Sequence, residues 1–237
     1  MKEPASPAPE MATRFRAEHP GEFFLAASER EALAAYLSSR GVLSASETLQ
    51  ETARAGDGNM NCTVRVTTSQ GSFIVKQSRP WVEKYPQFAA PRDRACREAE
   101  FYQLISPRPE VARVMPRILH FDASARLLVL EDLGTASDYT VVYRGGIFTG
   151  EEIGKLARFL RSLHEIREPE EAGTSLPNRE MRALNHDHIF RIPLMGQNGL
   201  DLDQLTPGLA EVARSLQADA DYVRTVADLG RDVYLAD

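Results

Sequence analysis

The sequence has few of the features that mark secreted, membrane-spanning or nucleic-acid-binding proteins. Its 237 residues include only two cysteines, too few to suggest a disulfide framework or a four-ligand zinc site. No stretch approaches the roughly 18 consecutive apolar residues of a membrane span, and prolines interrupt the N-terminus where a signal peptide would be apolar. The net charge of −6 argues against nucleic acid, because such domains usually present a basic face. We therefore expect a cytoplasmic protein that binds neither membranes nor nucleic acids.

The composition nevertheless allows a sizeable core. Hydrophobic residues make up 43% of the chain and charged residues 26%, a balance typical of a folded protein with one large domain or two small lobes. Residues 1–22 are rich in proline, alanine, glutamate and serine, so we expect a disordered lead-in there. A first helix is predicted to start at a capping box formed by Ser28 and Glu31 and to end at Gly41.

Apolar spacing predicts an α+β fold, with an antiparallel five-stranded sheet and one helix before a mainly helical second half. The first part forms a small lobe at residues 23–133, and the second lobe covers residues 134–237. Residues 80–91 contain three prolines and are expected to be irregular. In the second lobe Thr149 and Glu152 predict another capping box. The predicted strands are residues 48–54, 61–67, 73–76, 114–121 and 127–130, and a helix is expected over residues 91–105.

A glycine-bearing bend separates the first two predicted strands. Gly56 and Gly58 lack a Cβ and tolerate positive φ, so backbone N–H groups in the bend can approach an anion closely. The same dipeptides are common in ordinary turns, and the bend alone does not distinguish the two interpretations. Lys76 ends an apolar Phe-Ile-Val run on the third strand, where a cation either reaches outward to solvent or meets an anion.

Glu98 is the predicted partner of Lys76. It falls within the apolar arc of its helix, so we expect it to face the sheet and to pair with Lys76. Such a pair would hold the ammonium where the α- and β-phosphates of a nucleotide lie; the alternative is an ordinary surface ion pair. A strand lysine followed by a helix glutamate, behind a glycine bend, is the order of a protein-kinase-like small lobe. Backbone groups at Glu131 and Leu133, just after an apolar strand, would be free to hydrogen-bond a purine edge.

Five motifs occur in order along the chain: Gly56-Asp-Gly-Asn-Met-Asn61, Val75-Lys-Gln-Ser-Arg-Pro80, Asp93-Arg94 with Glu98, Pro116-Arg-Ile-Leu-His-Phe-Asp122 and Leu128-Val-Leu-Glu-Asp-Leu133. Together they resemble the aminoglycoside phosphotransferase superfamily, and within it the methylthioribose kinases, from about residue 23 onward. The resemblance implies a protein-kinase-like fold with ATP between two lobes. It places the bend over the phosphates, Lys76 on the α- and β-phosphates, and Glu98 in contact with Lys76. The nucleotide-binding residues it implies are Gly56, Asp57, Gly58, Asn59, Asn61, Lys76, Glu98, and, through their backbone, Glu131 and Leu133.

The parts that carry out transfer in this superfamily are not found in the sequence. The family has a His-Gly-Asp loop, whose aspartate orients the substrate hydroxyl, followed by an Asp-x-Glu type of metal motif. None of the five histidines precedes Gly-Asp. We therefore expect an N-terminal fragment that has no catalytic or metal-ligating residues of its own, although the family uses Mg²⁺ with ATP.

Several alternatives stay open at this point. In the methylthioribose kinases the acceptor is 5-methylthioribose and the product its 1-phosphate, in methionine salvage, but the sequence does not fix the acceptor for this chain. The chain is an ATP-dependent small-molecule kinase that is inactive alone, a non-catalytic nucleotide-binding or interaction module derived from one, or a non-functional remnant. A homodimer, or a separate segment that completes the chain, is compatible with the first two readings.

Overall fold

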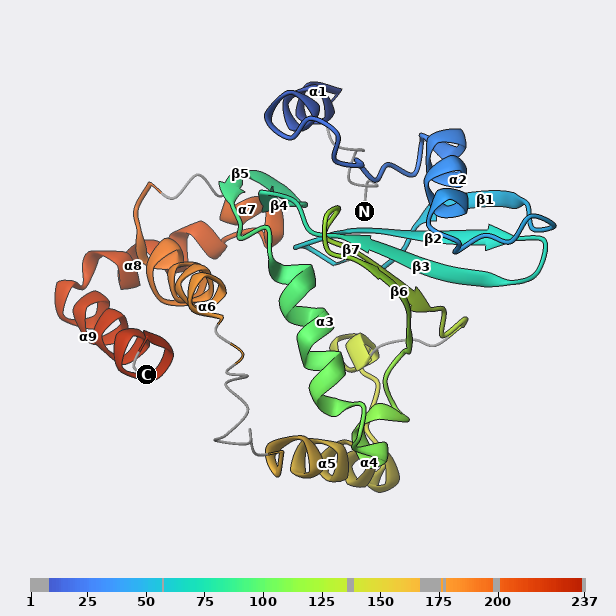
Figure 1. Ribbon diagram of the computed structural model, residues 1–237. Coiled ribbons are helices and arrows are strands. Elements are labelled where there is room, and N and C mark those ends of the chain that lie inside the picture. Colours follow the sequence, from blue (N-terminus) through green and yellow to red (C-terminus); the bar gives the residue numbers. More distant parts are fainter. Residues whose placement is uncertain are drawn as a thin grey trace. The chain divides into compact units, whose positions relative to one another are not determined.

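The computed structural model describes residues 9–56, 58–135, 139–166, 176, 178–197 and 201–235. The chain divides into two compact units, Met1–Leu176 and Pro177–Asp237, and the ribbon in Figure 1 is coloured along the sequence. The division differs from the lobe boundary expected at residues 133 and 134. The helix α5 (Gly150–His164) belongs to the first unit because it packs against α4 (Pro109–Ala112).

A five-stranded antiparallel sheet forms the centre of the first unit, as the sequence predicts. The strand order is β1-β2-β3-β7-β6, and the fold is α+β. One strand starts later than expected, at Ile118 instead of Val114, because the chain after α4 continues in turns up to Met115. The strands are β1 (Leu49–Arg54), β2 (Cys62–Thr68), β3 (Ser72–Gln77), β6 (Ile118–Asp122) and β7 (Leu127–Glu131).

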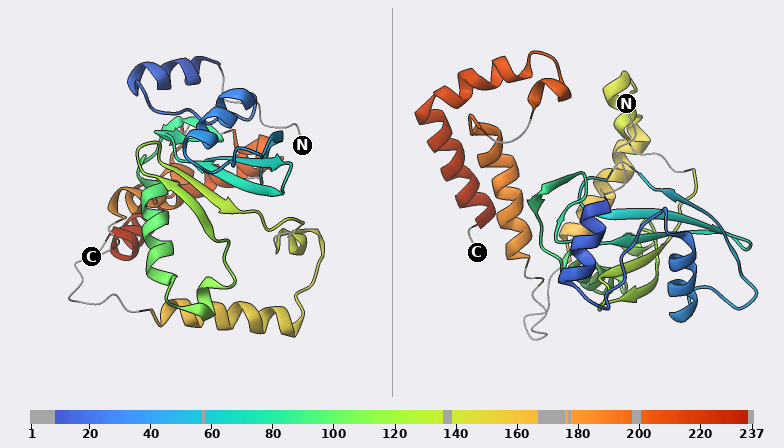
Figure 2. Two further views of the ribbon diagram at one scale, coloured as in Figure 1. Left: turned by 45° about the vertical axis from the view of Figure 1, so that its right-hand side comes forward. Right: turned by 90° about the horizontal axis from the view of Figure 1, so that it is seen from above.

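The two faces of the sheet bury different apolar clusters, because successive side chains of a strand point in opposite directions. Alternate residues of β2, β3 and β7 pack against α2 (Arg30–Ser39), which contributes the fully buried Leu33 and Leu37. On the other face, Leu128 and Leu130 pack against the small residues on one side of α3 (Arg94–Ile105). The left view of Figure 2 shows α3 running alongside these strands. Each fully buried leucine contributes about 1.5–3 kcal/mol to this core.

Part of the segment expected to be disordered is helical, which corrects that prediction. The helix α1 spans Pro9–Glu18, and its Phe15 is fully buried. The ring of Phe15 lies 5.2 Å from that of Phe24 and 6.1 Å from that of Trp81, between ring centroids. The composition of the segment does not predict this helix, because Phe15 is buried by rings that are distant in the sequence.

The segment 80–91, expected to be irregular, forms a second, two-stranded sheet. Its strands are β4 (Trp81–Val82) and β5 (Tyr85–Ala89). Pro86 lies inside β5, where it is tolerated because a two-stranded sheet leaves one side of each strand unpaired. The prediction failed because it treated every proline as a break in regular structure.

The start of α2 also differs from the prediction, whereas its end agrees. The N-cap residue is Glu29, which makes no side-chain cap, and the expected box between Ser28 and Glu31 does not form. Gly41 adopts φ +70°, and the N–H of the next residue donates to the Leu37 carbonyl at 2.9 Å. This is the left-handed C-cap for which glycine is favoured.

Helices account for most of the remaining described residues. The predicted capping box of Thr149 and Glu152 forms at the start of α5, with both of its hydrogen bonds present. No helix in the described part of the chain combines the length and the apolar character that crossing a bilayer would require. The first unit also contains η1 (Tyr139–Arg144), and the second unit contains α6 (Arg179–His186), η2 (Asp187–Arg191), η3 (Ile192–Leu194), α7 (Leu202–Leu205), α8 (Leu209–Ala218), α9 (Ala220–Gly230) and η4 (Arg231–Leu235).

Asp122 ties the end of β6 to α2. Its carboxylate accepts a hydrogen bond from the Tyr36 hydroxyl at 2.7 Å and lies 2.9 Å from Nε of Arg40. It also accepts from the backbone N–H groups of Ser124 and Ala125. Burial alone would raise the pKa of Asp122, but these hydrogen bonds and the nearby arginine outweigh burial and lower the pKa to about 2.

The stability of the protein should therefore fall in acid through Asp122. Because its folded-state pKa lies below the ordinary value of 3.8, the ionised carboxylate stabilises the fold above about pH 4. That stability, roughly 2 kcal/mol, is lost as the pH falls through the folded pKa of about 2. Urea unfolding of the wild type and of Asp122→Asn between about pH 6 and pH 2 measures this. The variant should be less stable at neutral pH and less sensitive to acid. Parallel pH profiles for the two proteins would contradict the assignment.

Candidate functional site

The glycine bend connects β1 to β2 within residues 55–61. The N–H of Ala55 donates to the Thr63 carbonyl at 3.0 Å and closes the base of the bend. Gly56 adopts φ +67°, and a Cβ added there would meet no atom within 4 Å, so backbone conformation and not crowding favours glycine. Gly58 and Asn59 are exposed, whereas the predicted site residue Asp57 lies outside the described residues.

Arg94, the first residue of α3, holds this bend in place. Its Nη2 donates to the Met60 carbonyl at 2.8 Å, and both Nε and Nη2 donate to Oδ1 of Asn61, at 3.1 and 3.0 Å. Arg94 is only 8% exposed, and burial lowers its pKa to about 10 while the carboxylate of Glu83 opposes the shift. The Asn61 side chain, predicted to bind nucleotide, therefore contributes its oxygen to the support of the bend.

A second contact also holds the bend. The N–H of Lys84, in the turn between β4 and β5, donates to the Asn59 carbonyl at 3.0 Å. Neither support was predicted from the sequence. Lys84 acts through its backbone, and the Asp93-Arg94 motif does not indicate that the arginine side chain is buried against the bend. The bend is thus held by two elements that lie more than twenty residues further along the chain.

Lys76 and Glu98 form the predicted ion pair. Nζ of Lys76 lies 2.6 and 2.8 Å from the two carboxylate oxygens of Glu98, and each side chain is 24% exposed. Glu100, in contrast, pairs with Arg97 along the outer side of the helix. Glu98 therefore faces the sheet, as the helical wheel predicts. Nearby, burial of the Tyr102 hydroxyl and the negative charge of Glu98 together raise the pKa of Tyr102 to about 12.

The helix α3 brings the bend and the ion pair together. Arg94 and Glu98 are four residues apart on this helix, a separation of about 6 Å along its axis on one side. On the sheet, Lys76 pairs with Thr63, which is two residues beyond Asn61. The ammonium of Lys76 and the backbone of the bend are thereby placed next to each other. A cation beside backbone N–H groups is the kind of arrangement that binds polyphosphate.

The segment after β7 is held by the carboxylate of Asp132, which lies in the last quoted motif but for which no role was predicted from the sequence. The side chain of Asp132 is 4% exposed and accepts hydrogen bonds from Ser72 at 2.7 Å and from the Gly134 N–H at 2.9 Å. It also pairs with Arg65, whose Nε lies 2.8 Å from Oδ2. Burial alone would raise the pKa of Asp132, but the hydrogen bonds from Arg65, Ser72 and Gly134 hold it below its usual value.

The two residues predicted to contact a base lie on either side of Asp132. The Glu131 carboxylate pairs with Arg117, and the N–H of Glu131 donates to the Arg117 carbonyl at 2.9 Å, so that N–H is already used. Leu133 is 55% exposed. The structure thus leaves the segment accessible beyond Glu131 and anchors it through Asp132.

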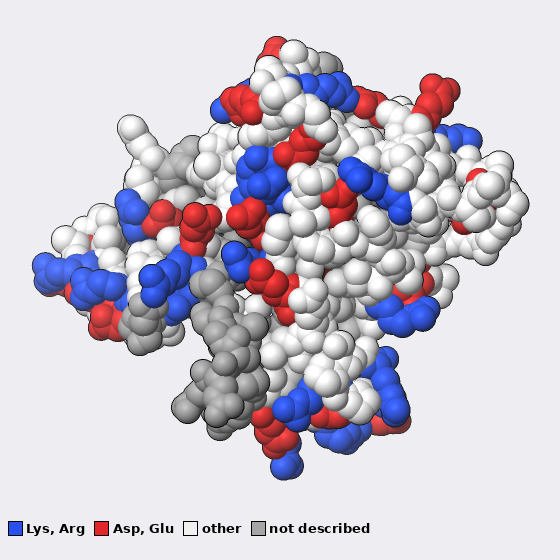
Figure 3. All heavy atoms as spheres, in the orientation of Figure 1, with Lys and Arg blue, Asp and Glu red and all other residues white. Residues whose placement is uncertain are grey.

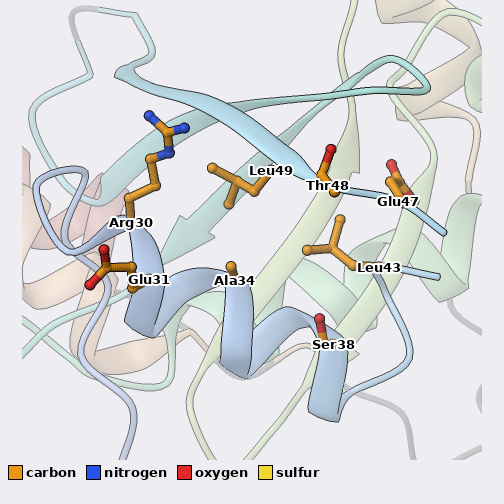
Figure 4. A pocket seen from close by; sticks show the side chains of 8 residues that line it. All are labelled: Arg30, Glu31, Ala34, Ser38, Leu43, Glu47, Thr48 and Leu49. Carbon is orange, nitrogen blue, oxygen red and sulfur yellow. The ribbon is translucent and has the colours of Figure 1, made fainter. Parts of the chain in front are cut away.

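A hollow of about 500 Å³ lies between α2 and β1, on the face of the sheet opposite Lys76 (Figure 4). None of the predicted site residues lines it. Acidic and basic side chains are interspersed over the face seen in Figure 3. Among the described residues, no group of three His, Cys, Asp or Glu side chains is arranged to hold a metal ion. The residues that line the hollow are Arg30, Glu31, Ala34, Ser38, Leu43, Glu47, Thr48 and Leu49.

Comparison with known proteins points to a kinase. The chain is similar to the methylthioribose kinase of Citrobacter koseri, with 33% identity over 119 residues, or 48% of this chain and 28% of the relative. The match thus spans well under two thirds of that relative's length. No protein-family model matches the chain. This weak similarity supports a kinase-like family, and the α+β fold with its antiparallel sheet is compatible with it.

Proposed function

We propose that this chain is the nucleotide-binding part of an ATP-dependent small-molecule kinase with a protein-kinase-like fold. The observation that carries the proposal is the ion pair of Lys76 and Glu98, next to a glycine bend that Arg94 supports. The similarity to a methylthioribose kinase adds to it. The register of β2 and β3 places this ion pair beside the supported bend, an arrangement that an ordinary surface ion pair does not require.

The residues of this chain would act by binding and orientation. Lys76 contacts the α- and β-phosphates, and Glu98 holds its ammonium in place. The backbone around Gly56, Gly58 and Asn59 lies over the phosphates, and the backbone near Glu131 and Leu133 meets the edge of the adenine. ATP supplies the phosphoryl group when bound. Mg²⁺ would bind together with ATP through its phosphates; among the described residues no group of three His, Cys, Asp or Glu side chains is arranged to hold the cation.

We further propose that the acceptor is a sugar hydroxyl, such as that of 5-methylthioribose, and that this polypeptide alone does not transfer phosphate. No histidine of the sequence precedes Gly-Asp, so the aspartate that would orient the hydroxyl is missing. A positioned general base contributes about 10²–10⁴-fold to the rate, and Lys76 cannot replace it because an ammonium is not a base.

A second candidate function is a nucleotide-binding module without catalysis, which the same missing tripeptide favours. The genomic reading frame beyond Asp237 separates the two candidates. An in-frame His-Gly-Asp segment followed by an acidic metal motif would support the kinase. A stop codon directly after Asp237 would support the module.

One experiment tests binding and transfer together. The purified 237-residue protein is heated with and without saturating Mg-ATP, and formation of phosphorylated 5-methylthioribose is assayed in parallel. We expect a rise in melting temperature equivalent to about 2–3 kcal/mol at 100 times the dissociation constant, and no product above background. Absence of any stabilisation would contradict the nucleotide site, and product formation that depends on Lys76 would contradict the proposed inactivity.

A further inference from the structure

Arg65 of β2 lies on the same face of the sheet as Lys76. It pairs with Ile74 of β3, and Ile74 is two residues before Lys76, so the three side chains share one face. Ile74 packs on the cluster between the sheet and α3, which identifies this face. Two residues of a strand span about 7 Å. Arg65 and Ile74 therefore lie beside the ion pair, displaced from it toward the segment that follows β7.

The guanidinium of Arg65 is fixed through the edge of its plane. Nε and Nη2 donate to the two carboxylate oxygens of Asp132, at 2.8 and 2.9 Å, and Nη2 also donates to the Gly134 carbonyl at 3.1 Å. Asp132 is itself buried and held by Ser72. These bonds lie in the guanidinium plane and do not use its flat faces. The Arg65 side chain remains 44% exposed.

We propose that Arg65 is a specificity-determining residue for the nucleobase, with its guanidinium stacked on a purine ring beside Ile74. This inference rests on the nucleotide site proposed above and adds the group that would select the base. A guanidinium stacks on aromatic rings because it is planar, weakly hydrated and attracted to their π-electrons. Asp132 is a positioning residue that holds both Arg65 and the chain from Glu131 to Gly134. The order along the site is then phosphates at Lys76 and base at Arg65.

Three ligands separate the contributions of base and phosphate: Mg-ATP, adenosine and inorganic tripolyphosphate. The variant Arg65→Lys keeps the positive charge and one hydrogen bond to Asp132 but loses the planar guanidinium group that would stack on the base. We expect the affinities for Mg-ATP and adenosine to fall by the same factor, about 5–10-fold. The affinity for tripolyphosphate should not change. Arg54→Lys, in β1 on the opposite face of the same sheet, is the matched control and should bind all three ligands as the wild type does.

The outcomes are distinct. Unchanged adenosine binding by a folded Arg65→Lys protein, or an equal loss for all three ligands, would overturn the base contact while the nucleotide site itself survived. If Arg65→Lys fails to fold, Arg65→Gln is measured instead. Because this variant also loses the positive charge, uncharged adenosine is the deciding ligand, and its affinity is again expected to fall about 5–10-fold with loss of the guanidinium. If the wild type binds none of the three ligands, the proposed function fails and the role of Arg65 fails with it.

Discussion

Replacement of Lys76 with alanine should weaken the binding of Mg-ATP by at least about 30-fold, equivalent to about 2 kcal/mol. Removal of one partner from a desolvated, hydrogen-bonded charge contact costs about 2–5 kcal/mol. The lysine side chain is 24% exposed, so water screens part of the interaction and the lower end of that range applies. Isothermal titration calorimetry of the two proteins gives the ratio of dissociation constants.

Two further variants show whether the loss is specific to the site. Lys155 on α5 also pairs with a glutamate, Glu151, at 2.8 Å, but it is 63% exposed, and Lys155→Ala should bind Mg-ATP unchanged. Glu98→Gln keeps a hydrogen-bonding side chain but loses the charge that holds the ammonium, so we expect a smaller loss than for Lys76→Ala. Equal losses for the Lys76 and Lys155 variants would mean that overall charge, and not this site, binds the nucleotide.

Replacement of Glu83 with alanine should lower the free energy of unfolding by about 3–5 kcal/mol. Its partner Arg79 is fully buried, with Nη1 2.9 and 3.0 Å from the two carboxylate oxygens. The guanidinium also lies 4.0 Å from the ring centroid of Phe24. Loss of the carboxylate leaves the buried guanidinium with its hydrogen bond to the Leu25 carbonyl but without a counter-charge, which is far more costly than the loss of an exposed pair. Urea unfolding at neutral pH measures the change.

The chain contains a control with the same spacing. Arg161 and Glu165 are also four residues apart and 2.8 Å from each other, but their side chains are 79% and 62% exposed. Glu165→Ala should therefore change the stability by no more than about 0.5 kcal/mol. Replacement of both buried partners, as Arg79→Met with Glu83→Leu, should recover most of the loss. Similar effects of Glu83→Ala and Glu165→Ala would contradict the role of burial.

Local rules predicted the central sheet and the ion pair well. Alternation of apolar residues places β1, β2, β3 and β7 to within a residue or two at each end, because the two faces of the sheet bury separate clusters. Helical periodicity alone was enough to turn Glu98 toward Lys76 and Glu100 away from it. Both results depend on features that lie within a single element.

Features that depend on several distant segments were missed. Phe15 is buried only because Phe24 and Trp81 meet it in space, and the hairpin of β4 and β5 forms despite Pro86. Arg94 and Asp132 lie in two of the quoted motifs, but neither was predicted to be a buried support, because arginine and aspartate are normally exposed and their partners come from other strands and turns. These two side chains nevertheless support the bend and the segment after β7, which are the parts assigned to the nucleotide.

Hydrogen–deuterium exchange of the 237-residue protein, with and without Mg-ATP, tests most directly whether the nucleotide binds at the bend and the ion pair. Bound phosphates would accept hydrogen bonds from amides in residues 55–61, and a bound base would shield the amides that follow Glu131. We predict slower exchange in these two segments and no change in the exposed helix α5. Protection confined to other parts of the chain, or no protection at saturating Mg-ATP, would contradict the proposed site.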